Sequence, residues 1–316
     1  MVEVPLATPC GEGEHSWLLV RKRNSNTPWV AQQLARFAGV PLSAVSYAGL
    51  KDRRAVTEQW FSVHLPGRPD PGWPDLAHDD FEVLSAQRHL RKLKTGTLLG
   101  NRFELRIREL DIDPALLEQR IDQVAAGGFP NYFGPQRFGR GGSNLDEAAR
   151  MFRQPRRRIA RAKRSIYLSA VRSALFNRVL AARVDNRSWN RALPGEALQL
   201  EGKSACFVVD TPDEETGRRT AALELHPTGP LCGDGESLCR GEALAFEQQQ
   251  LLGREGWIGA LRQARVNSSR RALRVVPRDL HWQDEGSHCG LLSFYLPAGS
   301  YATSLLDELI AVVETP

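Results

Sequence analysis

The chain has 316 residues, of which 41% are hydrophobic and 25% are charged, and its formal net charge is +5. These values are ordinary for a globular protein with a substantial core, and they exclude a disordered or fibrous chain. No apolar run approaches the roughly 20 residues of a transmembrane helix and no signal-peptide pattern opens the chain, so we expect a soluble cytoplasmic protein.

The first part of the chain mixes strands and helices without a regular βαβ rhythm. Strands are predicted at 16–23, 57–65, 81–89 and 101–110, and helices at 24–41 and 114–127. In the first helix we expect Thr27 as the N-cap and Pro28 at the first helical position, with Val30, Leu34 and Phe37 on one face. This pattern favours an α+β fold over a doubly wound one.

The composition and the predicted secondary structure change at about Phe129. A loop rich in Gly and Arg is followed by a basic helical region that includes 168–184, and then by short apolar pieces. The tail at 271–282 and 291–313 returns to strands and one helix. We therefore expect the middle to be an inserted domain and the two ends of the chain to share one sheet.

The cysteines do not indicate disulfides or a metal. They are odd in number and widely scattered, at Cys10, Cys206, Cys232, Cys239 and Cys289. Cys232 and Cys239 with His226 are the best candidates for metal ligands, but the spacing is poor and a fourth ligand is lacking. We expect reduced thiols and no metal.

Basic residues are concentrated in one block. Between Arg150 and Arg191 there are thirteen Lys or Arg and a single acid, Asp185. Such a block attracts a polyanion, because neutralised phosphates release condensed counterions. The alternative is a solvated helix face, but such faces usually mix charges of both signs. Nucleic acid is the favoured partner.

One short stretch carries the strongest chemical signal. In "YAGLKDRRAVTEQWFSV", Asp52 follows Gly49 and lies among Lys51, Arg53 and Arg54, in a loop before a strand. Gly49 offers backbone freedom for a tight turn or for close approach of a ligand, and the cations favour an ionised carboxylate and bind phosphates. Asp52 could then act as nucleophile or base on a nucleotide. The alternative is a turn residue or a surface ion pair.

Two further stretches suit RNA. In "GNRF", Asn101 can donate a hydrogen bond to a carboxylate and Phe103 can stack on a base, although a core position is the alternative for Phe103. In "GGFPNYFGPQRFGRGG", aromatic side chains alternate with Gly and Arg, which favours RNA contact over a purely structural loop. The motifs of other common catalytic sites are missing from the sequence.

Together these motifs resemble the TruD family of tRNA pseudouridine synthases. The first stretch matches the family's G-x-K-D-x-x-A-x-T-x-Q motif at Gly49, Lys51, Asp52, Ala55, Thr57 and Gln59. "GNRF", "NYFGPQRFG", "RALRVVPRDL" and "LPAGSYATSLLDEL" resemble its later motifs, so the resemblance covers nearly the whole chain. Family members usually carry an upstream P-x-D-F-x-V-x-E segment. Here only "MVEV" precedes "PLATP", so we expect a start that is trimmed relative to the family.

The resemblance implies a pseudouridine synthase fold, α+β with a mixed and largely antiparallel sheet, plus an inserted α/β TRUD domain. It places the catalytic domain at 1–128 and 270–316 and the TRUD insertion domain at 129–269. The implied activity is the isomerisation of uridine, at position 13 of the tRNA D arm, with no cofactor. The alternatives are a non-catalytic RNA-binding or RNA-folding protein on this scaffold, and a synthase for another RNA site.

The resemblance also implies roles for particular residues. Asp52 corresponds to the catalytic aspartate, and we assign substrate binding to Phe103, Asn101, Lys51, Gln59, Asn131, Phe133 and Arg137. From the basic block we assign contact with the tRNA to Arg156, Arg157, Arg158, Arg161, Lys163 and Arg164. We expect tRNA as the partner, no membrane, no obligate protein partner, and a monomer.

Overall fold

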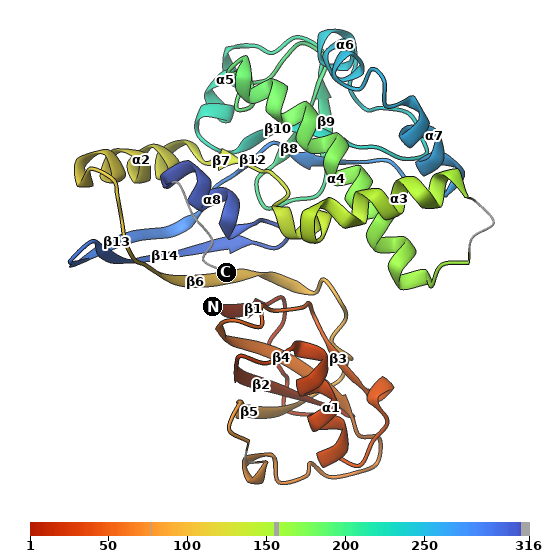
Figure 1. Cartoon of the computed structure of the whole chain (residues 1–316), viewed down its shortest axis with the longest axis vertical. Coiled ribbons are helices and arrows are strands. Elements are labelled where there is room, and N and C mark those ends of the chain that lie inside the picture. Colours follow the sequence, from red (N-terminus) through yellow and green to blue (C-terminus); the bar gives the residue numbers. More distant parts are fainter. Residues whose placement is uncertain (77, 155–157, 311–316) are drawn as a thin grey trace. The chain divides into compact units, whose positions relative to one another are not determined.

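The computed structural model describes residues 1–76, 78–154 and 158–310 (Figure 1). The chain divides into two compact units, each built from two separate segments. The first unit comprises Met1–Asp111 and Arg278–Gly299, and the second comprises Ile112–Pro277 and Ser300–Pro316. The boundaries expected from the sequence, after residues 128 and 269, both fall inside the second unit. The predicted bounds of the inserted domain, 129–269, therefore stay a prediction.

The first unit is built on one large sheet. Among the described residues eight strands form it, seven of them in the order β13-β14-β6-β1-β4-β2-β5, with β3 paired to β4. Only the β1–β4 pairing in this sheet is parallel, which confirms a mixed and largely antiparallel sheet. The strands are β1 (Val2–Pro5), β2 (His15–Arg23), β3 (Val45–Tyr47), β4 (Val56–His64), β5 (Phe81–His89), β6 (Leu98–Ile107), β13 (Arg278–Gly286) and β14 (Cys289–Pro297).

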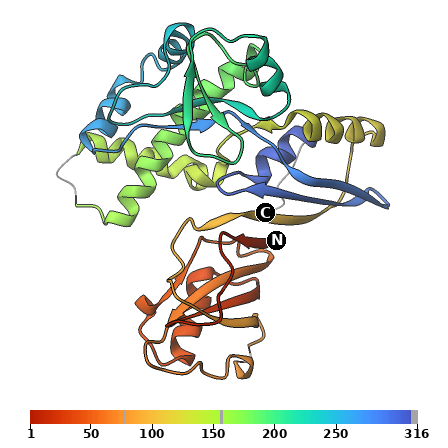
Figure 2. The ribbon, with the colours of Figure 1, turned by 180° about the vertical axis from the view of Figure 1, so that it is seen from behind.

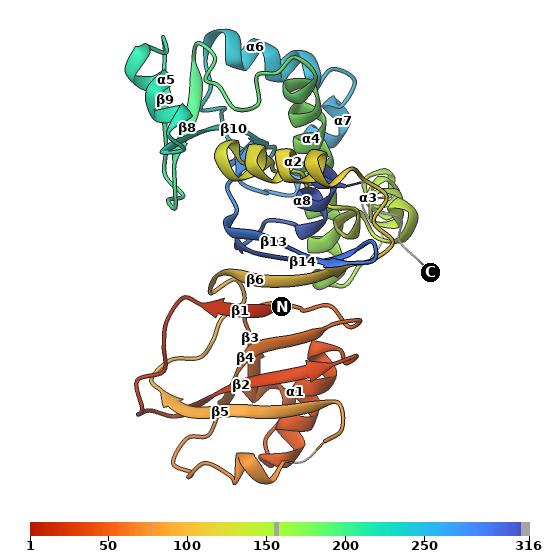
Figure 3. The ribbon, with the colours of Figure 1, turned by 90° about the vertical axis from the view of Figure 1, so that its left-hand side faces the viewer.

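Strands from the two ends of the chain lie side by side in this sheet (Figure 3). β14 pairs with β6 in continuous antiparallel register from Gly290 opposite Ile107 to Pro297 opposite Gly100. This confirms that the N- and C-terminal parts share a sheet. β6 also alternates as predicted, because Phe103 is half-buried while its neighbours Arg102 and Glu104 are exposed.

Helix α1 (Thr27–Phe37) covers one face of β2 and β4. Val30 and Leu34 are fully buried there, against Leu18 and Phe61 from the strands. Phe37 was expected on the same face but lies at its margin, 36% exposed. The predicted N-cap is one residue off: the cap is Asn26, and Thr27 begins the helix. The hydroxyl of Thr27 is used elsewhere, by the loop that carries Asp52.

The second unit surrounds a smaller antiparallel sheet with helices (Figure 2). Its described strands run in the order β11-β10-β8-β9, while β7 and β12 form a separate pair. The long helix α4 packs against β10, α3 and α6. The elements are β7 (Phe129–Pro130), β8 (Glu196–Leu200), β9 (Cys206–Val209), β10 (Leu225–Leu231), β11 (Ser269–Ala272), β12 (Arg274–Val275), α2 (Pro114–Gly127), α3 (Ser143–Arg153), α4 (Arg161–Asp185), α5 (Glu214–Ala221), α6 (Gly241–Gln250), α7 (Glu255–Gln263) and α8 (Ala302–Leu309).

Among the described residues, no helix is both long enough and apolar enough to cross a membrane.

Candidate active site

Asp52 lies in the loop that joins β3 to β4, within the first unit. Its side chain is exposed, and its carboxylate makes no hydrogen bond or ion pair with any residue that the structure describes. The flanking Arg53 and Arg54 are also exposed. Within the described ranges Asp52 is therefore not one half of a surface ion pair, and its carboxylate is accessible to a bound molecule.

The backbone of this loop is held from below by buried polar side chains. Gln59 of β4 donates from Nε2 to the carbonyl oxygen of Gly49 at 2.7 Å. The hydroxyl of Thr27 donates to Oε1 of Gln59 at 2.8 Å and accepts from the amide nitrogen of Lys51 at 3.1 Å. Gln59 and Thr27 are both fully buried. Gly49 does not adopt a positive φ, so a left-handed turn is not the reason for a glycine here, and close approach of a ligand stays a prediction.

A buried ion pair holds the side chain of Lys51. Its Nζ lies 2.7 Å from Oε2 of Glu3 and donates to Oδ1 of Asn101 at 2.9 Å. The side chains of Lys51 and Glu3 are 5% and 1% exposed, so water is excluded from this pair. Oε1 of Glu3 also accepts from the amide nitrogen of Trp60 at 3.3 Å. Lys51 therefore ties the loop to β1, β4 and β6 together.

Lys22 of β2 binds the backbone of Asp52, the predicted catalytic residue. Its ammonium donates to the backbone carbonyl oxygen of Asp52 at 2.9 Å and to that of Ser25 at 2.8 Å. The side chain is fully buried, and burial lowers the pKa of Lys22; the charge of Asp52 opposes this shift and that of Lys51 adds to it. Four buried side chains thus fix the loop over residues 49–52, and the carboxylate of Asp52 stays free.

Phe103 belongs to the same face of the sheet as this network. Glu3 is paired with Asn101 across β1 and β6, and Phe103 is two residues further along β6. Paired residues, and residues two apart, project from the same face. The ring of Phe103 stacks on that of Phe294, with centroids 5.0 Å apart and an angle of 17° between the planes. Phe294 is buried, whereas Phe103 keeps part of its surface accessible.

The geometry suggests different tasks for the residues predicted here. The amide of Gln59 and the ammonium of Lys51 are bonded within the network, so both are suited to holding the loop. Asn101 accepts from Lys51 through Oδ1, which leaves its Nδ2 as a donor. Glu3, Lys22 and Thr27 were not predicted as parts of this site. One feature of the sequence did point to Lys22. It lies two and four positions after Val20 and Leu18 in β2, so its side chain projects from the same face as these core residues.

Comparison with known proteins decides the family. The family model described as tRNA pseudouridine synthase D (TruD) matches residues 1–152 and 143–309 of this chain. Proteins named tRNA pseudouridine synthase D from Methylococcus capsulatus and Nitrosococcus oceani are 51% and 47% identical to it. Those alignments cover 96% and 99% of this chain, and 85% and 87% of the relatives. The chain belongs to the TruD family. The resemblance seen in the motifs is thereby confirmed, and with it membership in a family of isomerases.

A solved structure agrees with this assignment at the level of the fold. It is described as a tRNA pseudouridine synthase D from Methanosarcina mazei and is 22% identical to this TruD-family chain. The TM-score is 0.73, over 98% of this chain and 91% of that one. The predicted pseudouridine synthase fold is therefore confirmed.

The second unit of this TruD-family chain holds the three other predicted substrate-binding residues in internal contacts. Asn131 is 7% exposed and donates from Nδ2 to the carbonyl oxygen of Ala272 at 2.8 Å. Its Oδ1 accepts from the guanidinium of Arg271, which lies 4.1 Å from the ring centroid of Phe133. Phe133 is 9% exposed. These contacts account for Asn131 and Phe133 as parts of the core, and their role in substrate binding stays a prediction.

Arg137 is also engaged, but it is only half-buried. It donates from Nε to the hydroxyl of Tyr301 at 2.9 Å and from Nη1 to that of Ser169 at 3.2 Å. Its guanidinium also lies 5.4 Å from the ring centroid of Phe133. Contact between Arg137 and RNA stays a prediction.

The described residues that were assigned to tRNA contact are exposed, whereas Arg183 of the same basic block is buried in an ion pair with Glu196. Arg161, Lys163 and Arg164 occupy the first turn of α4, and Arg158 lies just before it. None of these four cations has an ion pair within the described part of the chain. Arg156 and Arg157 lie outside the described residues. A positive charge here sits at the N-terminal end of a helix, where it is electrostatically unfavourable unless an anion binds nearby.

The three candidate metal ligands, His226, Cys232 and Cys239, are not in a state that favours metal binding. His226 of β10 uses both ring nitrogens, with Glu201 at 2.8 Å and with the guanidinium of Arg274 at 3.1 Å. Burial raises the pKa of Cys232 to about 11 and that of Cys239 to about 12, so both thiols are protonated at neutral pH. Within the described ranges no cluster of three or more His, Cys, Asp or Glu is arranged to hold a metal.

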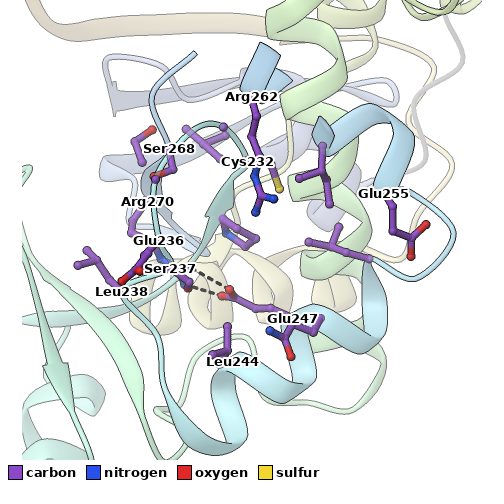
Figure 4. Close-up of a pocket in the computed structure, with 18 of the residues that line it drawn as sticks. Cys232, Glu236, Ser237, Leu238, Leu244, Glu247, Glu255, Arg262, Ser268 and Arg270 are labelled. Atoms are coloured by element: carbon purple, nitrogen blue, oxygen red, sulfur yellow. Dashed lines mark hydrogen bonds and ion pairs between the residues drawn. The ribbon is translucent and has the colours of Figure 1, made fainter. Parts of the chain in front are cut away.

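A pocket of about 780 Å³ also occurs in the second unit (Figure 4). It is bordered by α6, α7 and the loop after β10, and Glu247 and Arg270 form an ion pair in its wall, at 2.6 Å. None of the residues assigned to catalysis, substrate binding or RNA contact lines this pocket. The candidate active site is therefore the surface around Asp52, not this pocket.

Proposed function

We propose that this chain isomerises uridine to pseudouridine in tRNA, at position 13 of the D arm, with Asp52 as the catalytic carboxylate and without a cofactor. We further propose that it acts as a monomer in the cytoplasm. The observation that carries the proposal is the state of Asp52: an exposed carboxylate without a partner among the described residues, on a loop whose backbone is held by buried side chains. Membership in the TruD family supplies the reaction.

The reaction needs a fixed carboxylate more than it needs a cofactor. Isomerisation breaks the bond from C1′ to N1, turns the uracil, and joins C5 to C1′, so nothing is oxidised and no group is lost. Three routes use the carboxylate: attack on C1′, addition to C6 of the uracil, and removal of a sugar proton. A carboxylate beside a sugar carbon with developing positive charge also operates in glycosidases.

The target base must first leave its stack in the RNA. Extrusion of a base costs a few kcal/mol, and stacking on an aromatic ring returns about 1–3 kcal/mol. Phe103 suits this purpose, because Phe294 supports one of its faces and part of its surface stays accessible. The free Nδ2 of Asn101 is a donor for the base or for a carboxylate.

The hydrogen-bond network below the loop fixes the position of the Asp52 backbone. Catalytic groups gain when their geometry is set before the substrate binds, and a misplacement of about 1 Å can cost a factor of about 10². Lys51 and Gln59 are bonded within that network, so we assign them to holding the loop, not to direct contact with RNA.

The test is to map pseudouridine in a tRNA transcript after incubation with the protein. We expect the modification at uridine 13, and none in a transcript that carries cytidine at that position. Pseudouridine at another position would identify a synthase for another site. Binding of the tRNA without any pseudouridine would favour the non-catalytic RNA-binding alternative. Either result would overturn the proposal.

A further inference from the structure

Lys22 carries a buried positive charge without a carboxylate partner. Its side chain is 1% exposed, and its ammonium is bonded to two backbone carbonyl oxygens, those of Ser25 and Asp52. Among the residues that the structure describes, no carboxylate forms an ion pair with it. Its neighbour across the strands, Thr57 of β4, is likewise fully buried.

This arrangement works against folding. Burial lowers the pKa of Lys22, which means that the surroundings disfavour its charged form. A buried charge of this kind often costs more in desolvation than its contacts return, and an apolar side chain of similar size is then as stable or more stable. The two bonds to carbonyl oxygens offset part of this cost, and a hydrogen bond contributes only about 1 kcal/mol net to stability.

We propose that Lys22 is a positioning residue for the reaction assigned above: its ammonium fixes the backbone of Asp52 and places a positive charge beneath the carboxylate. This inference rests on the proposed function. It names a residue outside the matched motif, because Lys22 lies on β2, thirty residues before Asp52.

The other contacts of the loop leave Lys22 with a distinct task. Gln59 holds Gly49, and Thr27 holds the amide of Lys51. The bond from Lys22 is the last one before the loop turns toward the exposed Arg53, and it falls on the backbone of Asp52 itself. Without it the carbonyl of Asp52 would be free to rotate, and the side chain would turn with it.

The test is the variant Lys22→Met, which keeps an unbranched side chain shorter by one heavy atom and removes the ammonium and its charge. We expect kcat for pseudouridine formation to fall about tenfold or more, because a small displacement of a catalytic group is costly. The KM for tRNA should stay within about threefold, because Lys22 is buried and does not face the RNA. The thermal midpoint should change little, because relief of the desolvation of the charge offsets the loss of the two hydrogen bonds.

A second readout does not depend on activity. Hydrogen–deuterium exchange at 49–55 should be faster in Lys22→Met than in the parent protein. The matched control is Arg23→Met, which removes a charge from the next residue of the same strand, where the side chain is exposed. In that control kcat and the exchange at 49–55 should stay as in the parent.

Three outcomes would overturn the inference. They are a kcat within about twofold of the parent, unchanged exchange at 49–55, or a lowered thermal midpoint with normal turnover per folded molecule. Should Lys22→Met fail to fold, Lys22→Gln is judged by the same measurements. If the parent itself forms no pseudouridine, the proposed function fails while the exchange comparison still decides whether Lys22 positions the loop.

Discussion

At the scale of single residues, the candidate site separates bonded groups from free ones. Lys51, Gln59 and Lys22 use their polar atoms to hold backbone or each other. The carboxylate of Asp52 and the Nδ2 of Asn101 have no partner in the part of the chain that the structure describes, which leaves them accessible for a ligand. This division is what a preorganised site requires, since the groups that react must be placed by others that do not.

Phe103 offers a test at this scale. The variant Phe103→Leu keeps an apolar side chain against Phe294 but removes the aromatic face. We expect kcat/KM for tRNA to fall by about tenfold to a hundredfold, the value of a lost stacking contact of about 1–3 kcal/mol. Phe103→Tyr keeps the ring and should retain most of the activity. Equal activity in the leucine variant would show that the ring does not stack on the substrate.

At the scale of secondary-structure elements, the ends of β4, β2 and β5 bring three histidines together. His15 is paired with His64 on one side and with His89 on the other, and its ring stacks on that of His64 with centroids 4.6 Å apart. Burial chiefly, and then the charges of His64 and Lys92, lower the pKa of His15, while Glu14 has the opposite effect.

This lowered pKa gives a pH dependence with a definite sign. The folded state binds the proton on His15 less readily than the unfolded chain, where the pKa is about 6.5. The contribution to stability is therefore present above about pH 6.5 and is lost as the pH falls through the folded-state pKa. We expect the denaturant midpoint to drop between about pH 7.5 and pH 5.5. In His15→Phe, which keeps the stack but cannot be protonated, the drop should be smaller.

The control for this comparison is His281→Phe on β13, where the side chain is exposed. Its midpoint should follow that of the parent over the same pH range. A pH dependence in His15→Phe as steep as in the parent would contradict the role given to His15.

We expect the first turn of α4 to bind the tRNA. Replacing Arg161, Lys163 and Arg164 by Gln removes three exposed cations without touching the core. Each phosphate contact contributes about 0.7–0.9 to the slope of log K against log salt, so the slope should fall by about 2–3 and binding should weaken about tenfold or more. The measurement is the Kd for tRNA over a series of salt concentrations.

The control for α4 is Arg218→Gln on α5, which removes an exposed cation already paired with Glu215 at 2.7 Å. Its salt dependence should match that of the parent. An unchanged slope in the triple variant would mean that the first turn of α4 does not contact the RNA.

At the scale of the whole molecule, the sequence predicted what is periodic and missed what is long-range. The strand at 81–89 and the helix at 114–127 have the predicted bounds, because alternation and capping are local signals. In that helix Pro114 opens the first turn and Asp113 caps it. The family motifs likewise pointed to Asp52, Asn101 and Phe103, whose roles in the reaction stay predictions.

The residues that hold the active-site loop could not be found in this way. Glu3, Lys22 and Thr27 reach Lys51 and Asp52 across 24 to 48 positions of sequence, and a pattern within one strand does not show which loop lies above it. The displaced N-cap has the same origin. Thr27 is a residue type that often caps helices, but its hydroxyl is bonded to Gln59 of β4.

The central claim is that one free carboxylate, on a loop held by buried side chains, performs the isomerisation. The most direct measurement is the single-turnover rate of pseudouridine formation in Asp52→Asn, with tRNA binding and the thermal midpoint measured on the same protein. We predict a rate lower by about 10³ or more, with binding and stability close to those of the parent, because the carboxylate of Asp52 is exposed and has no partner among the described residues. Asp79→Asn, another exposed aspartate of the first unit, should keep the parent rate. A rate near that of the parent in Asp52→Asn would contradict the claim.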